Sequence, residues 1–335
     1  MKRGLRYCDD SRPGITRRKV RHGWGYWDAE GNRVTDREEI DRLNAVGLPP
    51  AYTDAWYCPH PHGHLQATGI DDRGRKQYRY HPEFRAAQEA AKYDRCTAFG
   101  HLLPRLRARI DADLRKRSLS KERAVAAVVR LLDRGHVRVG NEGYAKTNNS
   151  FGATTLRKRH AKLAGGALRL QYRAKSGKLR TLTLTDSSLR NFVKRCQDLP
   201  GQHLFAWLDE AGEARPVTST DVNDYIRDAM GDDFTAKHFR TWGASVIAFE
   251  ALADADSHIG VATMLEPVTH ALGNTPAIAR KSYVHPQLIY LAKDRDAQQA
   301  FRDALALPRA TRYLSRAERG LIAFLESAGV TAKAA

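Results

Sequence analysis

The sequence predicts an α+β fold, with a small β-rich N-terminal domain at residues 1–82 and a larger, mainly α-helical domain at residues 83–335. The chain of 335 residues is long enough for two domains with separate cores. Aromatic residues, glycine and proline are frequent before residue 82, whereas alanine-rich, helix-favouring sequence follows it. Residues 167–184 interrupt the helical part with alternating apolar and polar residues, which predicts a β-hairpin.

Short strands joined by turns are expected in the N-terminal domain. Aromatic and β-branched residues favour strands, and clusters of aspartate and glycine favour the turns between them. The expected strands include residues 23–27, 56–58 and 77–80. Turns are expected at residues 28–31, between two strand-like runs, and at residues 71–74. A short helix is expected over residues 36–45.

Helices should make up most of the second domain. Ser120 is a typical N-cap for an amphipathic helix that ends at Gly135. Because proline lacks the N–H that a helix interior needs, Pro104 should lie in a first turn and Pro267 should break its helix. The other helices are expected at residues 84–98, 102–117, 186–198, 219–230, 236–253, 258–272, 277–290, 295–306 and 315–327.

The charge of the chain indicates an anionic partner. Lys and Arg outnumber Asp and Glu by 56 to 38, which gives a formal net charge of +18. Such a surplus favours nucleic acid or an anionic membrane surface. We expect no membrane association, since no apolar run approaches the roughly 20 residues of a spanning helix and no lipidation motif occurs. The lack of a secretory signal and of paired cysteine motifs favours a reducing, cytoplasmic compartment.

Other patterns bear on metals and cofactors. No G-x-x-x-x-G-K-[ST] loop occurs, so ATP use is not expected. The aspartate pairs at residues 111–113 and 254–256 are two apart on expected helices, where they point away from each other. Residues 58–64, Cys-Pro-His-Pro-His-Gly-His, space four ligands about 6.6 Å apart along a strand, too far to close a tetrahedron without a partner segment. A loop whose histidines pack or touch phosphates is favoured over zinc, so we expect neither metal nor cofactor.

A further set of residues is spread along the second domain in an order that suits phosphoryl transfer. Taken singly, each has an ordinary interpretation, such as a surface ion pair, a solvated lysine or a packed tyrosine. Their combination in a basic chain that lacks metal and nucleotide motifs is more specific. The set comprises Arg138, Lys175 at the hairpin tip, Arg240 near the start of an apolar helix, Asn274 and Tyr283.

These groups could together perform transesterification at a phosphodiester of nucleic acid. The hydroxyl of Tyr283 would attack phosphorus, while two guanidiniums and an amide N–H hold the non-bridging oxygens. Lys175 would protonate the leaving sugar oxygen, and general acid catalysis of this kind contributes about 10²–10⁴ in rate. Free tyrosine has a pKa of about 10, so nearby cations must favour the phenolate. The covalent phosphotyrosine would conserve the energy of the broken strand, so religation would need no ATP.

In these residues the chain resembles the type IB DNA topoisomerases of the short bacterial and poxvirus-like group, over roughly residues 12–290. The resemblance implies that Tyr283 is the nucleophile, that Arg138 and Arg240 hold the transition state, and that Lys175 is the general acid, with assistance from Arg138 as an option. Many members carry histidine at the position of Asn274. Asparagine cannot donate a proton as imidazolium can, so we assign it only a hydrogen bond to phosphate. The stretches that carry the resemblance are residues 65–69, 74–81, 138–144, 175–178, 239–242 and 282–283.

The same resemblance implies a monomer whose two lobes close as a C-shaped clamp around double-stranded DNA in the nucleoid. The segment at residues 73–80 suits such a clamp, because Lys76, Tyr78 and Tyr80 would share one face of a strand and could reach a groove or phosphates. Half-buried strand tyrosines are the alternative. The DNA contacts that we expect are Gln66, Arg75, Lys76, Tyr78, Tyr80, Tyr144 and Lys146.

Two other functions compete with this interpretation. A tyrosine recombinase or integrase shares the arginine, lysine and tyrosine chemistry, but it usually carries histidine where this chain has Lys237 and a helical N-terminal domain where this chain has strands. A non-enzymatic nucleoid-binding protein would satisfy the charge alone. It would not need the hydroxyl of Tyr283.

Overall fold

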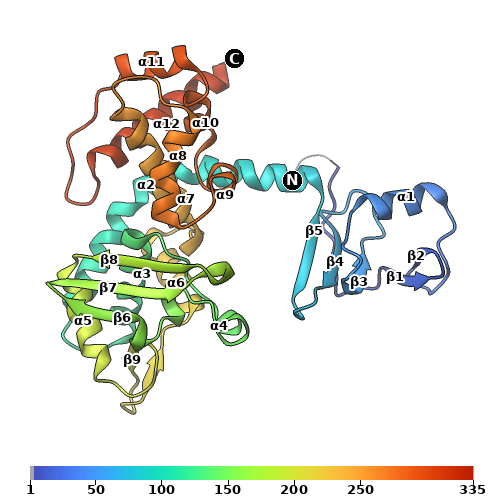
Figure 1. The fold of residues 1–335 in the computed structure, drawn as a ribbon, viewed down its shortest axis with the longest axis horizontal. Coiled ribbons are helices and arrows are strands. Elements are labelled where there is room, and N and C mark those ends of the chain that lie inside the picture. Colours follow the sequence, from blue (N-terminus) through green and yellow to red (C-terminus); the bar gives the residue numbers. More distant parts are fainter. Residues whose placement is uncertain (1–3, 335) are drawn as a thin grey trace. The chain divides into compact units, whose positions relative to one another are not determined.

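The computed structural model describes residues 4–334, with side chains except at residues 89–92, 144 and 328–334. The chain divides into two compact units, Met1–Lys92 and Tyr93–Ala335, whose elements are labelled in Figure 1. The α+β class is confirmed, because the first unit holds a five-stranded sheet and the second is mainly helical. Helix α2 (Pro82–Arg115) begins where the composition of the sequence changes, and the division into units falls within this helix.

The first unit is an antiparallel sheet with the strand order β2-β1-β3-β4-β5, which makes β5 an edge strand. Helix α1 (Arg37–Ala45) is capped by Asp36 and buries Leu43 in a small core with Ile15 and Tyr57. The predicted run after the turn at residues 28–31 is not a strand, because it forms only the single bridge Trp27↔Arg33. The strands are β1 (Ile15–Val20), β2 (Gly23–Trp27), β3 (Thr53–Tyr57), β4 (Leu65–Ile70) and β5 (Lys76–Tyr80).

Helix α3 lies at the centre of the second unit, and every residue from Arg123 to Asp133 in it is buried. Its predicted cap is confirmed, since Ser120 Oγ accepts a hydrogen bond of 3.4 Å from the N–H of Arg123. Helices α5, α6 and α7 pack against it. Besides α2, the helices are α3 (Lys121–Gly135), α4 (Glu142–Asn148), α5 (Ser187–Gln197), α6 (Ser219–Met230), α7 (Ala236–Ala253), α8 (Val261–Leu272), α9 (Pro276–Ser282), α10 (Pro286–Leu291), α11 (Arg295–Asp303) and α12 (Arg316–Ala334).

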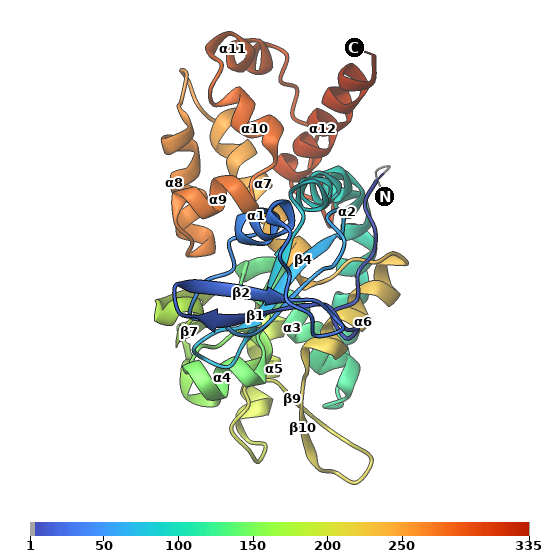
Figure 2. The same cartoon turned by 90° about the vertical axis from the view of Figure 1, so that its right-hand side faces the viewer.

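The predicted hairpin is confirmed as β7 (Ala167–Arg173) and β8 (Leu179–Leu184), which pair antiparallel. A further strand, β6 (Ala161–Ala164), was not predicted and completes a three-stranded sheet. The small hairpin of β9 (Ala206–Leu208) and β10 (Ala214–Pro216) was also not predicted. Figures 1 and 2 show the three-stranded sheet of β6, β7 and β8, together with α5, towards one end of the second unit, and α10, α11 and α12 at the other end.

Both expectations about proline inside helices were wrong. The two helices predicted at residues 84–98 and 102–117 are the single helix α2 with Pro104 in its interior, and α8 continues through Pro267. Proline removes one backbone hydrogen bond, but both helices bury apolar neighbours, such as Leu103 in α2 and Val268 in α8. Tertiary packing of an apolar face supplies most of the stability of a helix in a protein and here outweighs the lost bond.

The helix predicted at residues 277–290 is two helices, α9 and α10, and Tyr283 lies in the break between them. Proline disfavours helical backbone at the residue before it, and His285, which precedes Pro286, has a ψ of 134°. In the part of the chain that the structure describes, no helix combines the length and apolarity that crossing a membrane requires.

Candidate active site

Four of the five predicted catalytic residues come together in the second unit. Arg138 lies three residues after the end of α3, Arg240 lies in the first half of α7, Asn274 follows α8, and Tyr283 follows α9. Arg138 Nη2 lies 2.9 Å from Asn274 Oδ1, and Arg240 Cζ lies 4.8 Å from the ring centroid of Tyr283. Three helix ends and one helix interior, up to 145 positions apart (283 − 138), therefore meet at one place.

Arg240 is the buried anchor of this site. Only 3% of its surface is exposed, and its guanidinium donates from Nη1 to the carbonyl of His136 and from Nη2 to that of Leu272 at 3.2 Å. These carbonyls lie at the C-terminal ends of α3 and α8, where a cation is favourable. Burial, followed by the charge of Arg138, lowers the pKa of Arg240 to about 10, so it stays protonated at neutral pH.

Asn274 is oriented by Arg138. Its Oδ1 accepts the hydrogen bond from Arg138, and its buried Nδ2 has no hydrogen-bond partner among the described residues. A buried unsatisfied donor is costly and marks a place where a ligand can supply the acceptor. Gly273 ends α8 with a left-handed φ of +66°, a conformation that glycine adopts without strain, and so turns the chain towards this position.

Hydrogen bonds fix the backbone before and after Tyr283. Its N–H donates to the carbonyl of Ala279 at 3.0 Å. Ser245 on α7, which is fully buried, accepts from the N–H of His285 at 3.0 Å and lies 3.4 Å from the carbonyl of Tyr283. The half-buried tyrosine is thereby fixed to the helix that carries Arg240.

The electrostatics of Tyr283 favour its phenolate. Burial by itself raises the pKa of the hydroxyl. The charges of Arg240 and Arg138 and their hydrogen bonds to the tyrosine outweigh this effect, so the pKa lies below its ordinary value of 10.0. The site therefore stabilises the phenolate, which is the nucleophilic form of the side chain.

Lys175 does not join this cluster. It lies exposed on the tip between β7 and β8, in the single turn Lys175–Gly177, and makes no hydrogen bond or ion pair with any described residue. The tip is closed by a hydrogen bond of 2.8 Å from the N–H of Ala174 to the carbonyl of Lys178. The structure thus presents the lysine to solvent.

Arg180 belongs to the site but was not predicted. Its Nη2 donates to the carbonyl of Gly135 at 2.8 Å and to that of Ala271 at 2.6 Å. It therefore connects the hairpin that carries Lys175 to the ends of α3 and α8. A signal was available, because Arg180 alternates with Leu182 and Leu184 on the inward face of β8, where a charged residue is unusual.

His136 was also missed. It ends α3 with a left-handed φ of 49°, and its ring lies against Gly243 of α7, where a Cβ atom would approach Nδ1 to 2.3 Å. Burial lowers the pKa of His136 to about 4, so it is neutral at physiological pH. Its packing brings the carbonyl that receives Arg240 close to α7.

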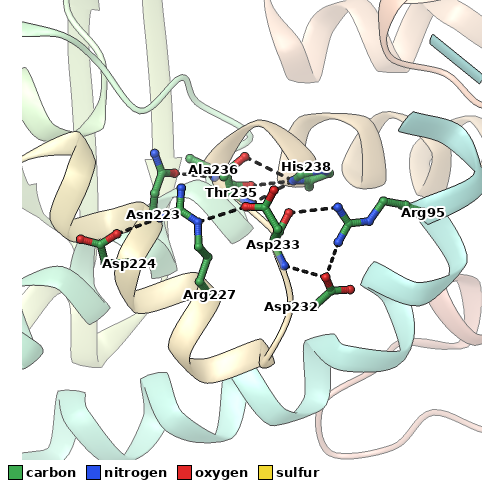
Figure 3. A network of polar contacts seen from close by, with 9 residues as sticks. All are labelled: Arg95, Asn223, Asp224, Arg227, Asp232, Asp233, Thr235, Ala236 and His238. Carbon is green, nitrogen blue, oxygen red and sulfur yellow. Dashed lines mark hydrogen bonds and ion pairs between the residues drawn. The ribbon is translucent and has the colours of Figure 1, made fainter. Parts of the chain in front are cut away.

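A polar network fixes the start of α7 (Figure 3). Arg95 of α2 donates to Asp232 Oδ1 at 2.6 Å and to the carbonyl of Asp233 at 3.2 Å. Asn223 of α6 accepts from the N–H of Ala236 at 3.1 Å, and His238 Nδ1 accepts from the N–H of Thr235 at 2.9 Å. Helices α2 and α6 therefore determine where the first turns of α7, and with them Arg240, lie.

The C-terminal helix α12 is tied to the helices that carry the site. Arg107 Nη2 lies 2.8 Å from Asp133 Oδ1 on α3 and 2.7 Å from Glu318 Oε1 on α12. The indole of Trp242 on α7 donates to the same Glu318 oxygen at 3.2 Å. All four side chains are buried, so removal of one partner would leave an uncompensated buried charge.

The strand β5 presents the exposed face that the sequence predicted. Tyr78 and Tyr80 are 47% and 45% exposed, and their rings stack at a centroid distance of 6.1 Å. Lys76 Nζ lies 6.0 Å from the centroid of Tyr78 and 2.7 Å from Asp10 Oδ2. Arg75, which directly precedes this strand, pairs with Asp71 at 2.7 Å.

The other predicted DNA contacts lie in different surroundings. Gln66 is 7% exposed and donates to the carbonyls of Gly63 and Pro61 at 2.7 and 2.9 Å, so its amide holds the loop before β4. Lys146 is exposed on α4. The side chain of Tyr144 lies outside the described residues.

The described residues contain no group of three or more His, Cys, Asp or Glu side chains that could hold a metal ion. The aspartates at residues 111–113 pair with cations instead, Asp111 with Arg130 and Asp113 with Lys116 at 2.6 Å. In the loop at residues 58–64, Cys58 contacts Cys8.

Similar proteins identify the family. The family described as "Eukaryotic DNA topoisomerase I, catalytic core" matches residues 81–285, and "Bacterial DNA topoisomerase IB, N-terminal domain" matches residues 23–71. The DNA topoisomerase 1B of Acanthamoeba polyphaga mimivirus is 31% identical over 285 residues, which cover 81% of this chain and 85% of the relative.

Two solved structures of the XerH site-specific recombinase were also found, a pre-cleavage complex with difH substrate and a post-cleavage complex with palindromic difH. Both match at 18% identity and a TM-score of 0.39. The match covers 61% and 60% of this chain. It covers about half of each recombinase chain, 52% and 51%. Similarity at this level decides nothing about activity. The two family matches and the viral relative show the family: the chain belongs to the type IB DNA topoisomerases.

Proposed function

We propose that this isomerase relaxes supercoiled duplex DNA through Tyr283. The hydroxyl oxygen of Tyr283 attacks a backbone phosphorus, a bond from phosphorus to the tyrosine oxygen forms, and the bond to the 5′ oxygen of the next nucleotide breaks. The product is a 3′-phosphotyrosyl link and a free 5′ hydroxyl. Reversal of the same step, after the strands have rotated, reseals the DNA.

The observation that carries this proposal is the pair of arginines around the tyrosine. Arg240 and Arg138 together hold the pKa of Tyr283 below its ordinary value against the opposing effect of burial. The same two cations can stabilise the charge that develops on the non-bridging oxygens, in a site where their positions are already fixed. Arginine thus takes the electrostatic role that a metal has in other phosphoryl-transfer enzymes, and the proposed reaction needs no metal and no ATP.

The remaining groups have distinct roles. Asn274 Nδ2, which has no partner among the described residues, donates to a phosphate oxygen. Lys175 protonates the leaving 5′ oxygen. Because it lies exposed on a hairpin tip, we propose that contact of the tip with bound DNA brings the lysine to that oxygen.

We further propose that one chain clamps the duplex as a monomer in the cytoplasm, associated with the nucleoid. The formal net charge of +18 supports a partner of high negative charge. The exposed face of Lys76, Tyr78 and Tyr80 on β5 supplies a cation and two rings to the DNA. Arg75 and Lys146 add positive charge, while Gln66 supports the loop before β4.

Relaxation of a plasmid by Tyr283→Phe and Tyr290→Phe tests the nucleophile. Both changes remove one hydroxyl, and Tyr290 is 54% exposed on α10, outside the site. We expect Tyr283→Phe to abolish relaxation in buffer without Mg²⁺ or ATP and to keep the affinity for duplex DNA. Tyr290→Phe should relax the plasmid at the rate of the unchanged enzyme. Relaxation by Tyr283→Phe would refute the assignment.

A further inference from the structure

The loop at residues 58–64 brings together two cysteines that are 50 positions apart. Cys58 Sγ lies 2.8 Å from Cys8 Sγ. Both are free thiols; Cys58 is completely buried, while Cys8 is partly exposed. A disulfide bond is about 2.05 Å long, so a small movement of either side chain would allow the bond to form.

Backbone pairing holds the two sulfurs at this place. The N–H of Arg6 donates to the carbonyl of His62, and the N–H of His64 donates to the carbonyl of Arg6, both at 2.8 Å. The N–H of Cys8 then donates to His64 Nδ1 at 3.0 Å. A Cβ atom at Gly63 would lie 2.4 Å from Cys58 Sγ and 2.7 Å from Cys8 Sγ, so the glycine leaves the space that the two sulfurs occupy.

The surroundings favour a bond between the sulfurs over a shared metal. A structural zinc site needs four ligands, and no described group reaches three. The Nδ1 atoms of the nearest histidines are already acceptors, that of His60 from the N–H of His62 at 3.1 Å and that of His64 from Cys8.

We propose that Cys8 and Cys58 are a site of reversible thiol oxidation, at which a low-molecular-weight disulfide such as oxidised glutathione converts the pair into an intramolecular disulfide. The Cys8 thiolate attacks one sulfur of the reagent and releases one glutathione thiolate. The Cys58 thiolate then attacks Cys8 Sγ and releases the second. The two cysteines lose two protons and two electrons, and the reagent becomes two thiols.

The exposure of the two sulfurs fixes the order of these steps. Only Cys8 can meet a reagent in solution, because Cys58 is completely buried. Burial, together with the hydrogen bond and charge of Cys58, raises the pKa of Cys8 to about 11. The thiolate is the reactive form, so the first step should become about tenfold faster for each unit of pH between 7 and 9. In a reducing compartment the bond would form under oxidative stress and be reversed by thiols.

The bond would tie the N-terminal segment to the sheet of the first unit. That segment includes Asp10, which lies against Lys76 of β5. Trypsin cleaves after Arg6 and after Arg17, so in the oxidised protein the peptide of residues 7–17 would stay attached to the peptide that contains Cys58 only through this bond.

Peptide mapping of the full-length protein tests the proposal. The protein is incubated with oxidised glutathione at pH 8, the remaining thiols are alkylated, and the digest is analysed by mass spectrometry without reduction. We expect a peptide that links Cys8 to Cys58 and that dithiothreitol separates. Cys58→Ser should instead accumulate glutathione on Cys8, and Cys8→Ser should leave Cys58 unmodified.

The double variant Cys96→Ser/Cys196→Ser is the matched control, because both residues are buried in the second unit, and it should form the link as the unchanged protein does. Three results would overturn the proposal: a stable glutathione adduct on Cys8 of the unchanged protein without a linked peptide, a link that involves Cys96 or Cys196, or no modification of Cys8 at all.

Discussion

Arg138 donates a hydrogen bond of 2.9 Å from Nη2 to Oδ1 of Asn274, and this contact turns the amide nitrogen of Asn274 away from the arginine. The nitrogen has no other partner among the described residues. Arg138 thereby orients Asn274, whose amide nitrogen offers a hydrogen-bond donor at a position where many members of the family carry histidine.

Asn274→Asp should cleave DNA far more slowly than the unchanged enzyme. The new carboxylate can still accept the hydrogen bond from Arg138, but it offers no donor and adds a negative charge beside the phosphate. The loss of one such donor costs about 10²–10³ in rate, and the charge should add to this loss. Single-turnover cleavage of a nicked duplex measures the effect, with Asn191→Asp, a change at an exposed residue of α5, as the control. Equal rates for the two variants would exclude the hydrogen bond from Asn274 to phosphate.

Lys175→Ala should lose cleavage on ordinary DNA and recover on DNA with a better leaving group. General acid catalysis contributes about 10²–10⁴ in rate, and a sulfur at the leaving 5′ position needs no proton. Cleavage rates on the two substrates give the comparison. Lys178→Ala removes a second exposed lysine of the same tip and should lose little on either substrate. The same loss for Lys175→Ala on both substrates would exclude the acid role.

Arg180→Ala should slow cleavage on both of those substrates to a similar degree. Arg180 positions the ends of α3 and α8 through their carbonyls, so its loss should disturb Arg138 and Asn274 without affecting proton donation. A purely structural role would instead lower the melting temperature of the variant, which calorimetry can detect. Recovery of Arg180→Ala on the sulfur substrate would show that it acts on the leaving group instead.

Acid should destabilise the enzyme through His136. Burial lowers the pKa of this histidine to about 4 in the folded chain, while an unfolded histidine has a pKa of about 6.5. The unfolded chain therefore binds the proton first, and the free energy of unfolding falls as the pH drops from 6.5 to 4, by an amount on the order of 3 kcal/mol for this group. His136→Asn, which tolerates the left-handed backbone, should make this part of the profile less steep in urea unfolding, although burial also lowers the pKa values of His160, His238 and His285 to about 4. An unchanged slope in the variant would contradict this assignment.

Asp10→Asn should strengthen the binding of duplex DNA. Asp10 pairs with Lys76 at 2.7 Å, so its neutralisation leaves the lysine available to a DNA phosphate. The affinity should then fall more steeply between about 50 and 200 mM salt. The slope of log affinity against log salt concentration should change by about one phosphate contact. Fluorescence anisotropy measures both. Asp72→Asn makes the same change in net charge on the exposed turn between β4 and β5 and should affect binding less. Identical curves for the two variants would argue against a DNA contact at Lys76.

Local signals predicted much of the fold. The cap at Ser120 and the hairpin of β7 and β8 depend on neighbouring residues, and both were found where expected. The single helix expected around Tyr283 was wrong, because the constraint that Pro286 places on His285 was overlooked. The continuous helix through Pro104 could not be predicted locally, since it depends on packing against distant segments.

The residues of the site were predicted from their types and order. Their positions depend on contacts between distant segments, which the sequence does not reveal. Arg180 and His136 act through backbone carbonyls and close packing with segments far along the chain, 45 and 91 positions away in the case of Arg180. Gln66, expected at the DNA, is buried with its amide bonded to main-chain carbonyls. Residue type alone does not distinguish an amide that faces a ligand from one that supports a loop.

Chemical identification of the covalent intermediate tests the central claim most directly. The enzyme is reacted with a nicked duplex that cannot be resealed, the reaction is stopped with denaturant, and the peptide that carries the nucleotide is sequenced by mass spectrometry. We expect a single adduct, in which the oxygen of Tyr283 is joined to a 3′ phosphate. An adduct on another residue, a link to a 5′ phosphate, or no covalent product would contradict the mechanism.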